Sequence, residues 1–145
     1  MENQYKNQFE LCARAVIQNR GRILICWHRL SKYYFLPGGH VDFGEAAESA
    51  LVRELKEELD IKVKKISFIG LVENIYKDRN DKEKHHEINL VFNVIAEKAR
   101  DKSKEDHIDF VFFNKKEFQK EKVLPVSLQK SVIKWLKDKK RFWAN

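Results

Sequence analysis

The sequence contains little cysteine, proline and glycine: two Cys, two Pro and five Gly among 145 residues. Cys12 and Cys26 each lie in an apolar, strand-like segment, without the cysteine–histidine spacing of a zinc site, so we expect two buried, reduced thiols. No repeat and no Pro/Gly/Ser-rich linker divides the chain. We therefore expect a single domain over residues 1–145, large enough to form a core without disulfide bonds.

Long hydrophobic runs are also missing. The first ten residues, MENQYKNQFE, lack the apolar core of a signal peptide, and no later run approaches the length of a membrane span. These features predict a cytoplasmic protein without a membrane partner.

The charge balance is basic, with 29 Lys and Arg against 22 Asp and Glu and a formal net charge of +7. Such a balance favours anionic ligands, phosphates included. The basic residues recur in small groups rather than in one arm, which favours a lysine-rich solvated surface over a nucleic-acid-binding stripe. A hydrophobic content of 43% with 12% aromatic residues is typical of a globular protein.

Apolar periodicity predicts mostly strands, one central helix, further strands and a last helix. We expect strands at Phe9–Ile17, Arg22–Trp27, Tyr33–Leu36, Ile66–Tyr76, Glu87–Ala96 and Ile108–Phe113, helices at about Ala46–Leu59, Lys115–Lys120 and Ser127–Lys139, and polar loops at Lys77–His86 and Lys98–His107. Asn19-Arg20-Gly21 has the composition of a hairpin turn, and Ser127 is the expected N-cap of the last helix. This order predicts an α/β (α+β) fold with a mixed sheet and helices on its faces.

The central helix places Glu54, Glu57 and Glu58 on one face within about one turn. Like charges at this spacing repel, and acids late in a helix also meet the negative end of its dipole. A divalent cation such as Mg²⁺ reverses that penalty, because hard cations bind carboxylate oxygens. The face is therefore predicted to be a metal site, while Leu51, Val52, Leu55 and Leu59 are predicted to be buried against the sheet.

The loop before this helix adds to the prediction. Gly38 and Gly39 let the backbone approach a ligand closely, and a carbonyl from this loop can join a metal shell. Glu45 lies at the helix start, where a carboxylate suits the positive dipole end and can pair with a basic side chain. Arg53 flanks the acidic face and can orient a glutamate.

The segment GHVDFGEAAESALVRELKEELDI, from Gly39 to Ile61, resembles the signature of the Nudix hydrolases, the MutT-like pyrophosphohydrolases. That signature is a glycine, five residues, a glutamate, seven residues and then Arg-Glu-aliphatic-any-Glu-Glu-any-Gly-aliphatic. The matching residues here are Gly39, Glu45, Arg53, Glu54, Leu55, Glu57, Glu58 and Ile61. Asp60 replaces the final glycine, and we expect it to end the helix in a left-handed conformation.

The resemblance implies an alpha-beta-alpha sandwich that hydrolyses the pyrophosphate linkage of a nucleoside diphosphate derivative with Mg²⁺ or Mn²⁺. Carried over by position, Glu57 and Glu58 would be the main metal ligands, joined by the Gly38 carbonyl. Glu54 would be a ligand or the general base, and Glu45 with Arg53 would brace loop and helix.

Residues outside the motif give weaker predictions. Family members often recruit a further acid; Glu87 is the first choice here, before Glu73, Glu105 and Asp106. Arg14, on the strand face of Cys12 and Val16, suits bidentate phosphate binding, with a snorkelling arginine at a sheet edge as the alternative. Gly39, Phe43 and Tyr76 are further candidate substrate contacts, and His85 and His86 must point to opposite faces if they lie in a strand.

The substrate is the least defined part of the prediction. Some subfamilies carry a proline or tyrosine 15 to 18 residues past the motif; Tyr76 falls close to that window and no proline does, which disfavours ADP-ribose. Nucleotide sugars, dinucleoside polyphosphates and nucleoside triphosphates stay open. The alternatives are a non-catalytic nucleotide-binding or regulatory module and an RNA 5′-end pyrophosphohydrolase, and relatives are commonly homodimers.

Overall fold

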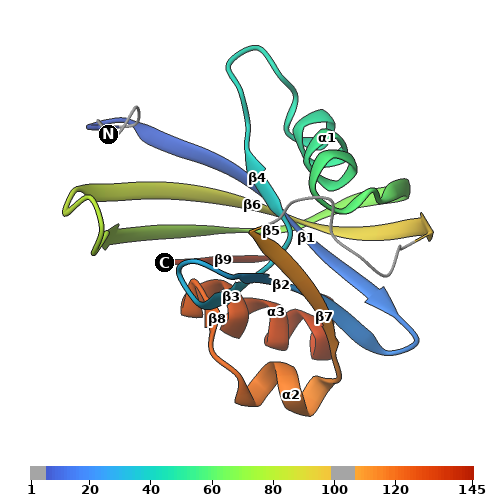
Figure 1. Ribbon diagram of the computed structural model, residues 1–145. Coiled ribbons are helices and arrows are strands. Elements are labelled where there is room, and N and C mark those ends of the chain that lie inside the picture. The colour runs from blue at the N-terminus through green and yellow to red at the C-terminus, as the bar shows by residue number, and fades with distance from the viewer. Residues whose placement is uncertain (1–5, 99–106) are drawn as a thin grey trace.

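The computed structural model describes residues 6–98 and 107–145. Within these ranges nine strands form one mixed sheet, and three helices pack against it (Figure 1). The strands are β1 (Phe9–Asn19), β2 (Arg22–His28), β3 (Tyr33–Phe35), β4 (Gly38–His40), β5 (Lys62–Lys77), β6 (Lys84–Lys98), β7 (Ile108–Phe113), β8 (Val123–Leu124) and β9 (Phe142–Ala144). The helices are α1 (Ala47–Leu59), α2 (Lys115–Lys120) and α3 (Val126–Asp138).

Strand β1 joins the two halves of the sheet. It pairs in parallel with β6, which pairs antiparallel with β5, and β5 pairs in parallel with the short β9. Arg20 and Gly21, both with positive φ, form the predicted turn into β2, but β1 and β2 pair only beside this turn. Beyond it β2 pairs with β3 and β7, and β4 takes its place beside residues 12–14 of β1.

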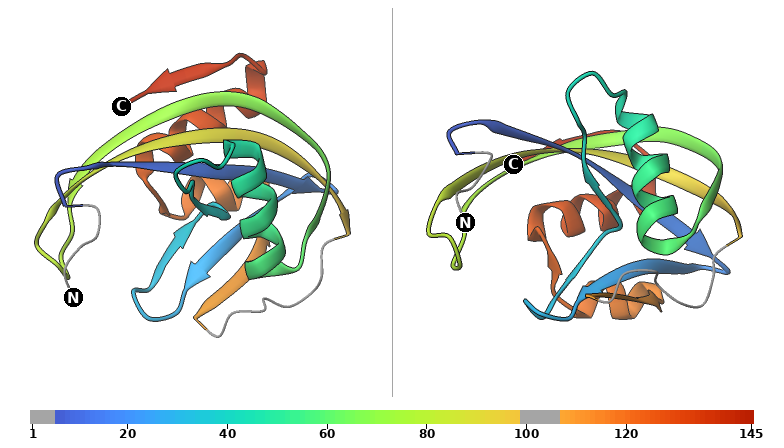
Figure 2. Two further views of the ribbon diagram at one scale, coloured as in Figure 1. Left: turned by 90° about the horizontal axis from the view of Figure 1, so that it is seen from above. Right: turned by 45° about the horizontal axis from the view of Figure 1, so that its top comes forward.

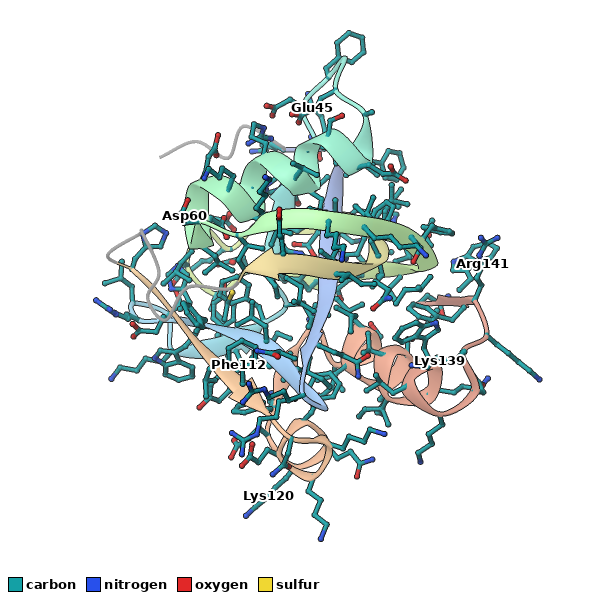
Figure 3. The ribbon with its side chains drawn as sticks, turned by 90° about the vertical axis from the view of Figure 1, so that its right-hand side faces the viewer. Glu45, Asp60, Phe112, Lys120, Lys139 and Arg141 are labelled. Carbon is teal, nitrogen blue, oxygen red and sulfur yellow. The ribbon has the colours of Figure 1, made fainter. Side chains whose placement is uncertain are left out.

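The helices cover both faces of the sheet. In Figure 3, α1 runs between the labels of Glu45 and Asp60 on one side, while α2 and α3 lie on the other side near Lys120 and Lys139. Two buried clusters follow from this layering. One joins α1 to Ala13, Ala15 and Ile17 of β1, and the other joins α2 and α3 to Val16 and Val91. The predicted alpha-beta-alpha sandwich with a mixed sheet is confirmed.

Helix α1 follows its predicted pattern with one exception. Leu51, Leu55 and Leu59 are buried, but Val52 is 41% exposed, because it lies at the edge of the apolar stripe rather than beneath it. Asp60 ends the helix in the left-handed region, at φ 53°, as predicted. Its carboxylate accepts a hydrogen bond from Lys56 at 2.7 Å, which holds the residue that replaces the signature glycine.

Several element boundaries differ from the prediction. Strand β5 starts at Lys62 and β6 at Lys84. The predicted loop at Lys77–His86 is therefore shorter in the structure, at residues 78–83, because cross-strand pairing continues through the polar residues on both sides of it. The short β4, β8 and β9 were not predicted. Helix α3 begins at Val126 after Pro125, whose carbonyl accepts the first helical bonds, so Ser127 lies inside the helix and is not its N-cap.

Both cysteines are buried free thiols, as predicted. Burial raises the pKa of Cys12 to about 11, so this thiol stays protonated and unreactive at neutral pH. Among the described residues, no helix is both long and apolar enough to cross a bilayer.

Candidate active site

Arg53 is the centre of the polar face of α1. Its guanidinium forms a two-pronged contact with the Glu45 carboxylate, with Nε and Nη2 each 2.9 Å from an oxygen. Nη1 donates to Glu54 at 3.0 Å and to Glu57 at 3.4 Å, and Nη2 reaches the His40 carbonyl at 3.4 Å. The Arg53 guanidinium thus connects the β4–α1 loop, the helix start and two of the three clustered glutamates.

The contacts between Arg53 and its carboxylate partners stabilise the charged forms of both Arg53 and Glu45. Hydrogen bonding from Arg53 holds the pKa of the Glu45 carboxyl below its usual value. The same bond, together with the contact to Glu54, raises the pKa of Arg53, although partial burial opposes the charge. The side chain of Glu54 is only 16% exposed, whereas that of Glu57 is 55% exposed. Glu54 is therefore fixed in place, and Glu57 has room to rotate.

Two glycines bring the loop backbone close to β1 and to the acidic face. A Cβ at Gly38, where φ is 136°, would lie 2.0 Å from the Ala13 carbonyl oxygen, so only glycine lets β4 pair with β1 here. A Cβ at Gly39 would lie 2.6 Å from the carboxyl carbon of Glu54. The backbone at Gly39 therefore packs directly against a carboxylate of the helix.

A second polar group lies on the α3-facing side of β1, β5 and β6. Register places Cys12 beside Asn89, and Arg14 beside Val91, on this face. The Glu87 carboxylate accepts a hydrogen bond from the Tyr76 hydroxyl at 3.1 Å, and burial together with the Glu87 charge raises the pKa of Tyr76. Tyr76 also stacks on His85, with ring centroids 5.0 Å apart.

Arg14 connects this group to α1. Burial disfavours its charge, but Cys12, Glu87 and Glu58 outweigh that effect and raise the pKa of Arg14. Its Nη1 donates to the Leu36 carbonyl at 3.2 Å. Because β1 is flanked by β4 and β6, the alternative of a snorkelling arginine at a sheet edge is wrong. A charged guanidinium lies instead within electrostatic reach of both Glu58 on the helix and Glu87 on β6.

The sequence interpretation missed Glu10, a buried carboxylate that joins three elements. It contacts His85 Nδ1 at 2.7 Å and His40 Nε2 at 3.2 Å, and His85 Nε2 contacts Asp81 at 2.9 Å. His40 directly follows Gly39, so this chain of side chains reaches the loop beside α1. The sequence signal that could have identified Glu10 is its place as an acid near the start of the otherwise apolar strand β1.

Other candidates lie apart from the two groups. Phe43 is fully exposed at the tip of the β4–α1 loop, and no aromatic ring is recorded against it within the described residues. Glu73 is on the opposite face of the sheet, 3.2 Å from His86 Nε2, so His85 and His86 do point to opposite faces. Glu105 and Asp106 lie outside the described residues.

The acidic face has the chemistry of a divalent-cation site. Its donors are hard carboxylate oxygens, and the backbone at Gly39 lies so close to Glu54 that a Cβ there would clash with the carboxylate. In residues 6–98 and 107–145, no three His, Cys, Asp or Glu side chains converge closely enough to hold an ion as they stand. Arg53 contacts the carboxylates of Glu54 and Glu57 in this structure. The fit to a divalent cation is one of donor chemistry, since such cations prefer carboxylate oxygens.

A sequence profile described as the NUDIX domain matches residues 9–136. The chain belongs to the Nudix family. An ADP-ribose pyrophosphatase of Methanocaldococcus jannaschii is 31% identical to this Nudix protein over 128 residues, which cover 83% of this chain and 70% of the relative. The Nudix resemblance deduced from Gly39–Ile61 is confirmed, and the protein is an enzyme that acts on pyrophosphate bonds.

Solved structures support the same fold. A MutT NUDIX hydrolase from Burkholderia pseudomallei is 26% identical, with a TM-score of 0.65 over 76% of this Nudix chain and 86% of that chain. The MutT protein from Methanosarcina mazei Go1 is 18% identical, with a TM-score of 0.75 over 96% and 99% of the two chains. The latter likeness shows the fold alone.

Proposed function

We propose that this Nudix enzyme hydrolyses the pyrophosphate linkage of a nucleoside diphosphate derivative, with Mg²⁺ or Mn²⁺ as cofactor. The arrangement of α1 supports this proposal: Arg53 holds Glu45, Glu54 and Glu57 in one network, against a loop backbone that approaches within contact of Glu54. Three acids on one helical turn destabilise a helix unless a cation compensates them.

The proposed roles are those that the Nudix signature implies for the matching residues. Glu57 and Glu58, with the Gly38 carbonyl, would hold the cation, and Glu54 would be a further ligand or the general base. A bound divalent cation neutralises diphosphate charge and lowers the pKa of bound water. Because Glu54 is held at 3.0 Å by Arg53, its carboxylate is preoriented to bind or to accept a proton.

The second polar group is proposed to bind the substrate. Arg14 carries a positive charge between Glu58 and Glu87 and suits a phosphate oxygen. Tyr76 presents a ring and a hydroxyl beside Glu87, and we keep Glu87 as the proposed metal ligand outside the motif. The Phe43 ring is fully exposed. It can contact the substrate only if the loop moves or if the substrate itself places a planar group against this ring.

ADP-ribose belongs to the proposed substrate class, since it is a nucleoside diphosphate joined to a sugar. The name of the Methanocaldococcus jannaschii relative favours it, whereas the absence of a proline 15 to 18 residues past the motif disfavours it. The substrate screen therefore includes ADP-ribose together with nucleotide sugars, dinucleoside polyphosphates and nucleoside triphosphates. RNA with a 5′-triphosphate is a separate arm, and binding there should fall steeply with salt.

The test is turnover of this panel with Mg²⁺, with Mn²⁺ and with chelator, for three forms of the protein. Glu57→Gln should abolish turnover while the protein remains folded, because it removes one charge from the cation site. Glu48→Gln is the matched control, since Glu48 is an exposed acid in the first turn of the same helix. Normal turnover by Glu57→Gln, or metal-independent turnover by the unmodified enzyme, would contradict the proposal.

A further inference from the structure

The net charge of the chain is concentrated in one layer of the fold. Residues 114–141 hold ten Lys and Arg and three Asp and Glu, whereas the remainder of the chain holds 19 of each, so this segment accounts for the whole excess of +7. It contains α2, β8 and α3, and the two helices lie together on the side of the sheet away from α1 (Figure 2, right). We call residues 114–141 the basic layer.

The cations of the basic layer are not compensated by acids of the same chain. Within residues 6–98 and 107–145, none of the ten takes part in an ion pair. Two of the three acids of the layer bind backbone groups instead: Glu117 accepts from the Asn114 amide at 2.9 Å, and Asp138 accepts from the Lys140 amide at 2.9 Å. Solvated surfaces usually intersperse both signs, so a layer of one sign indicates an anionic partner.

A small apolar hollow lies between the two helices of the basic layer. Three apolar side chains and three exposed polar ones line it, namely Phe118, Ile133 and Leu136 with Lys115, Gln119 and Lys137. Its volume of about 30 Å³ is about two to three times what one water molecule needs. The hollow can therefore take the few carbon atoms at the end of an aliphatic side chain, but not an aromatic ring. We call it the α2–α3 groove.

The charge and the groove together narrow the class of partner. A phosphodiester backbone offers no apolar group to fill the α2–α3 groove, and unpaired bases need exposed aromatic rings on which to stack. Between residues 114 and 141, all of which the structure describes, no large apolar side chain is exposed. The layer therefore also lacks the protruding groups that insert into a membrane interface. The same layer of a second copy is excluded, because its lysines would meet like charges.

We propose that the basic layer docks an acidic segment of another protein, which places one aliphatic side chain in the α2–α3 groove and carboxylates beside Lys115 and Lys137. One of these lysines comes from each helix, so acids on both sides of the inserted side chain meet a cation. The lysines supply long-range attraction, and the groove supplies specificity. Because α1 lies on the opposite side of the sheet, the docked segment leaves the acidic face of α1 uncovered (Figure 3).

Fluorescence anisotropy with the full chain at low salt tests the proposal, using a labelled nine-residue peptide with a central leucine between four glutamates on each side. The unmodified protein should bind this peptide. Replacing its leucine by serine should weaken binding by about 5-fold, because the groove then receives no apolar group. Lys137→Glu should weaken binding by at least about 3-fold. Lys64→Glu is the matched control, since it changes the net charge equally at an exposed residue of β5 outside the basic layer, and its effect should be smaller.

Circular dichroism checks that both variants are folded. Leucine-dependent binding that Lys137→Glu weakens more than Lys64→Glu supports the proposal. The proposal is overturned if the peptide does not bind up to submillimolar protein, if the leucine and serine peptides bind equally, or if Lys64→Glu weakens binding as much as Lys137→Glu. Binding of phosphatidylserine vesicles or of a DNA duplex that Lys137→Glu weakens, without leucine-dependent peptide binding, also overturns it by assigning the basic layer to a membrane or a nucleic acid.

Discussion

Replacing Arg53 by Ala removes the positive charge shared by three carboxylates, those of Glu45 in the β4–α1 loop and of Glu54 and Glu57 on α1. Each partly exposed ion pair contributes about 0.2–1 kcal/mol. Loss of the contacts to Glu45, Glu54 and Glu57 should therefore lower the free energy of unfolding by about 1–3 kcal/mol. For a domain of this length that corresponds to a melting temperature lower by about 3–10 °C.

The effect on turnover should be larger than the effect on stability. Arg53 fixes the Glu54 carboxylate and the loop that begins at Gly39, and small displacements of such groups cost about 100-fold in rate. We expect Arg53→Ala to reduce kcat by at least about 100-fold. Arg53→Lys keeps the charge but loses the two-pronged contact with Glu45, so it should recover much of the stability and little of the rate.

The assay combines thermal unfolding, in chelator and in Mg²⁺, with steady-state kinetics on the substrate found in the screen. A cation should offset part of the repulsion that Arg53→Ala creates, so its loss of melting temperature should be smaller in Mg²⁺ than in chelator. The reasoning is refuted if Arg53→Ala keeps near-normal kcat. It is also refuted if Arg53→Lys restores the rate fully, because the geometry of the guanidinium would then be irrelevant.

Two further predictions concern the neighbouring loop and β6. Gly39→Ala should displace Glu54 and abolish turnover, whereas Gly21→Ala, strained by a φ of 74° but with open space around it, should cost about 1 kcal/mol in a melting experiment and leave turnover intact. Burial lowers the pKa of His85, but its bonds to Asp81 and Glu10 outweigh this and raise it. His85 therefore stabilises the fold fully below its unfolded pKa of about 6.5, and this contribution is lost as pH rises through the higher folded pKa. Urea unfolding against pH should show the loss, and His85→Asn should remove it; an identical pH profile in the variant would contradict this assignment.

The sequence was sufficient to predict α1 to within one residue, because its acidic and leucine positions repeat at the helical period and Asp60 provides a stop. It was not sufficient for β4, β8 and β9. These strands of two or three residues show no apolar alternation, and what defines them is their pairing with β1, β3 and β5. The same reason explains β5 and β6, whose polar ends at Lys62 and Lys84 pair across the sheet although their composition is typical of loops.

The candidate site likewise has one part that the sequence predicts and one part that only the tertiary structure reveals. Glu54, Glu57 and Glu58 lie within five residues of one another, so local helix geometry alone places them together. Glu10 and His85 are 75 residues apart, and only the parallel register of β1 with β6 brings them within 2.7 Å. No local pattern carries that register. The alternation of His85 and His86 could be predicted, but the partner on each face could not.

The two glycines before α1 show how the fold and the site depend on each other. Gly38 has the backbone conformation and the close approach to Ala13 that let β4 occupy the place vacated by β2. Once β4 is there, the next residue, Gly39, must lie against Glu54, where any side chain would clash. The observed position of the Glu54 carboxylate therefore requires a glycine at this point of the motif, because β4 occupies the place beside β1 that β2 leaves. Loss of activity in Gly38→Ala should consequently come with loss of stability, whereas Gly39→Ala should separate the two.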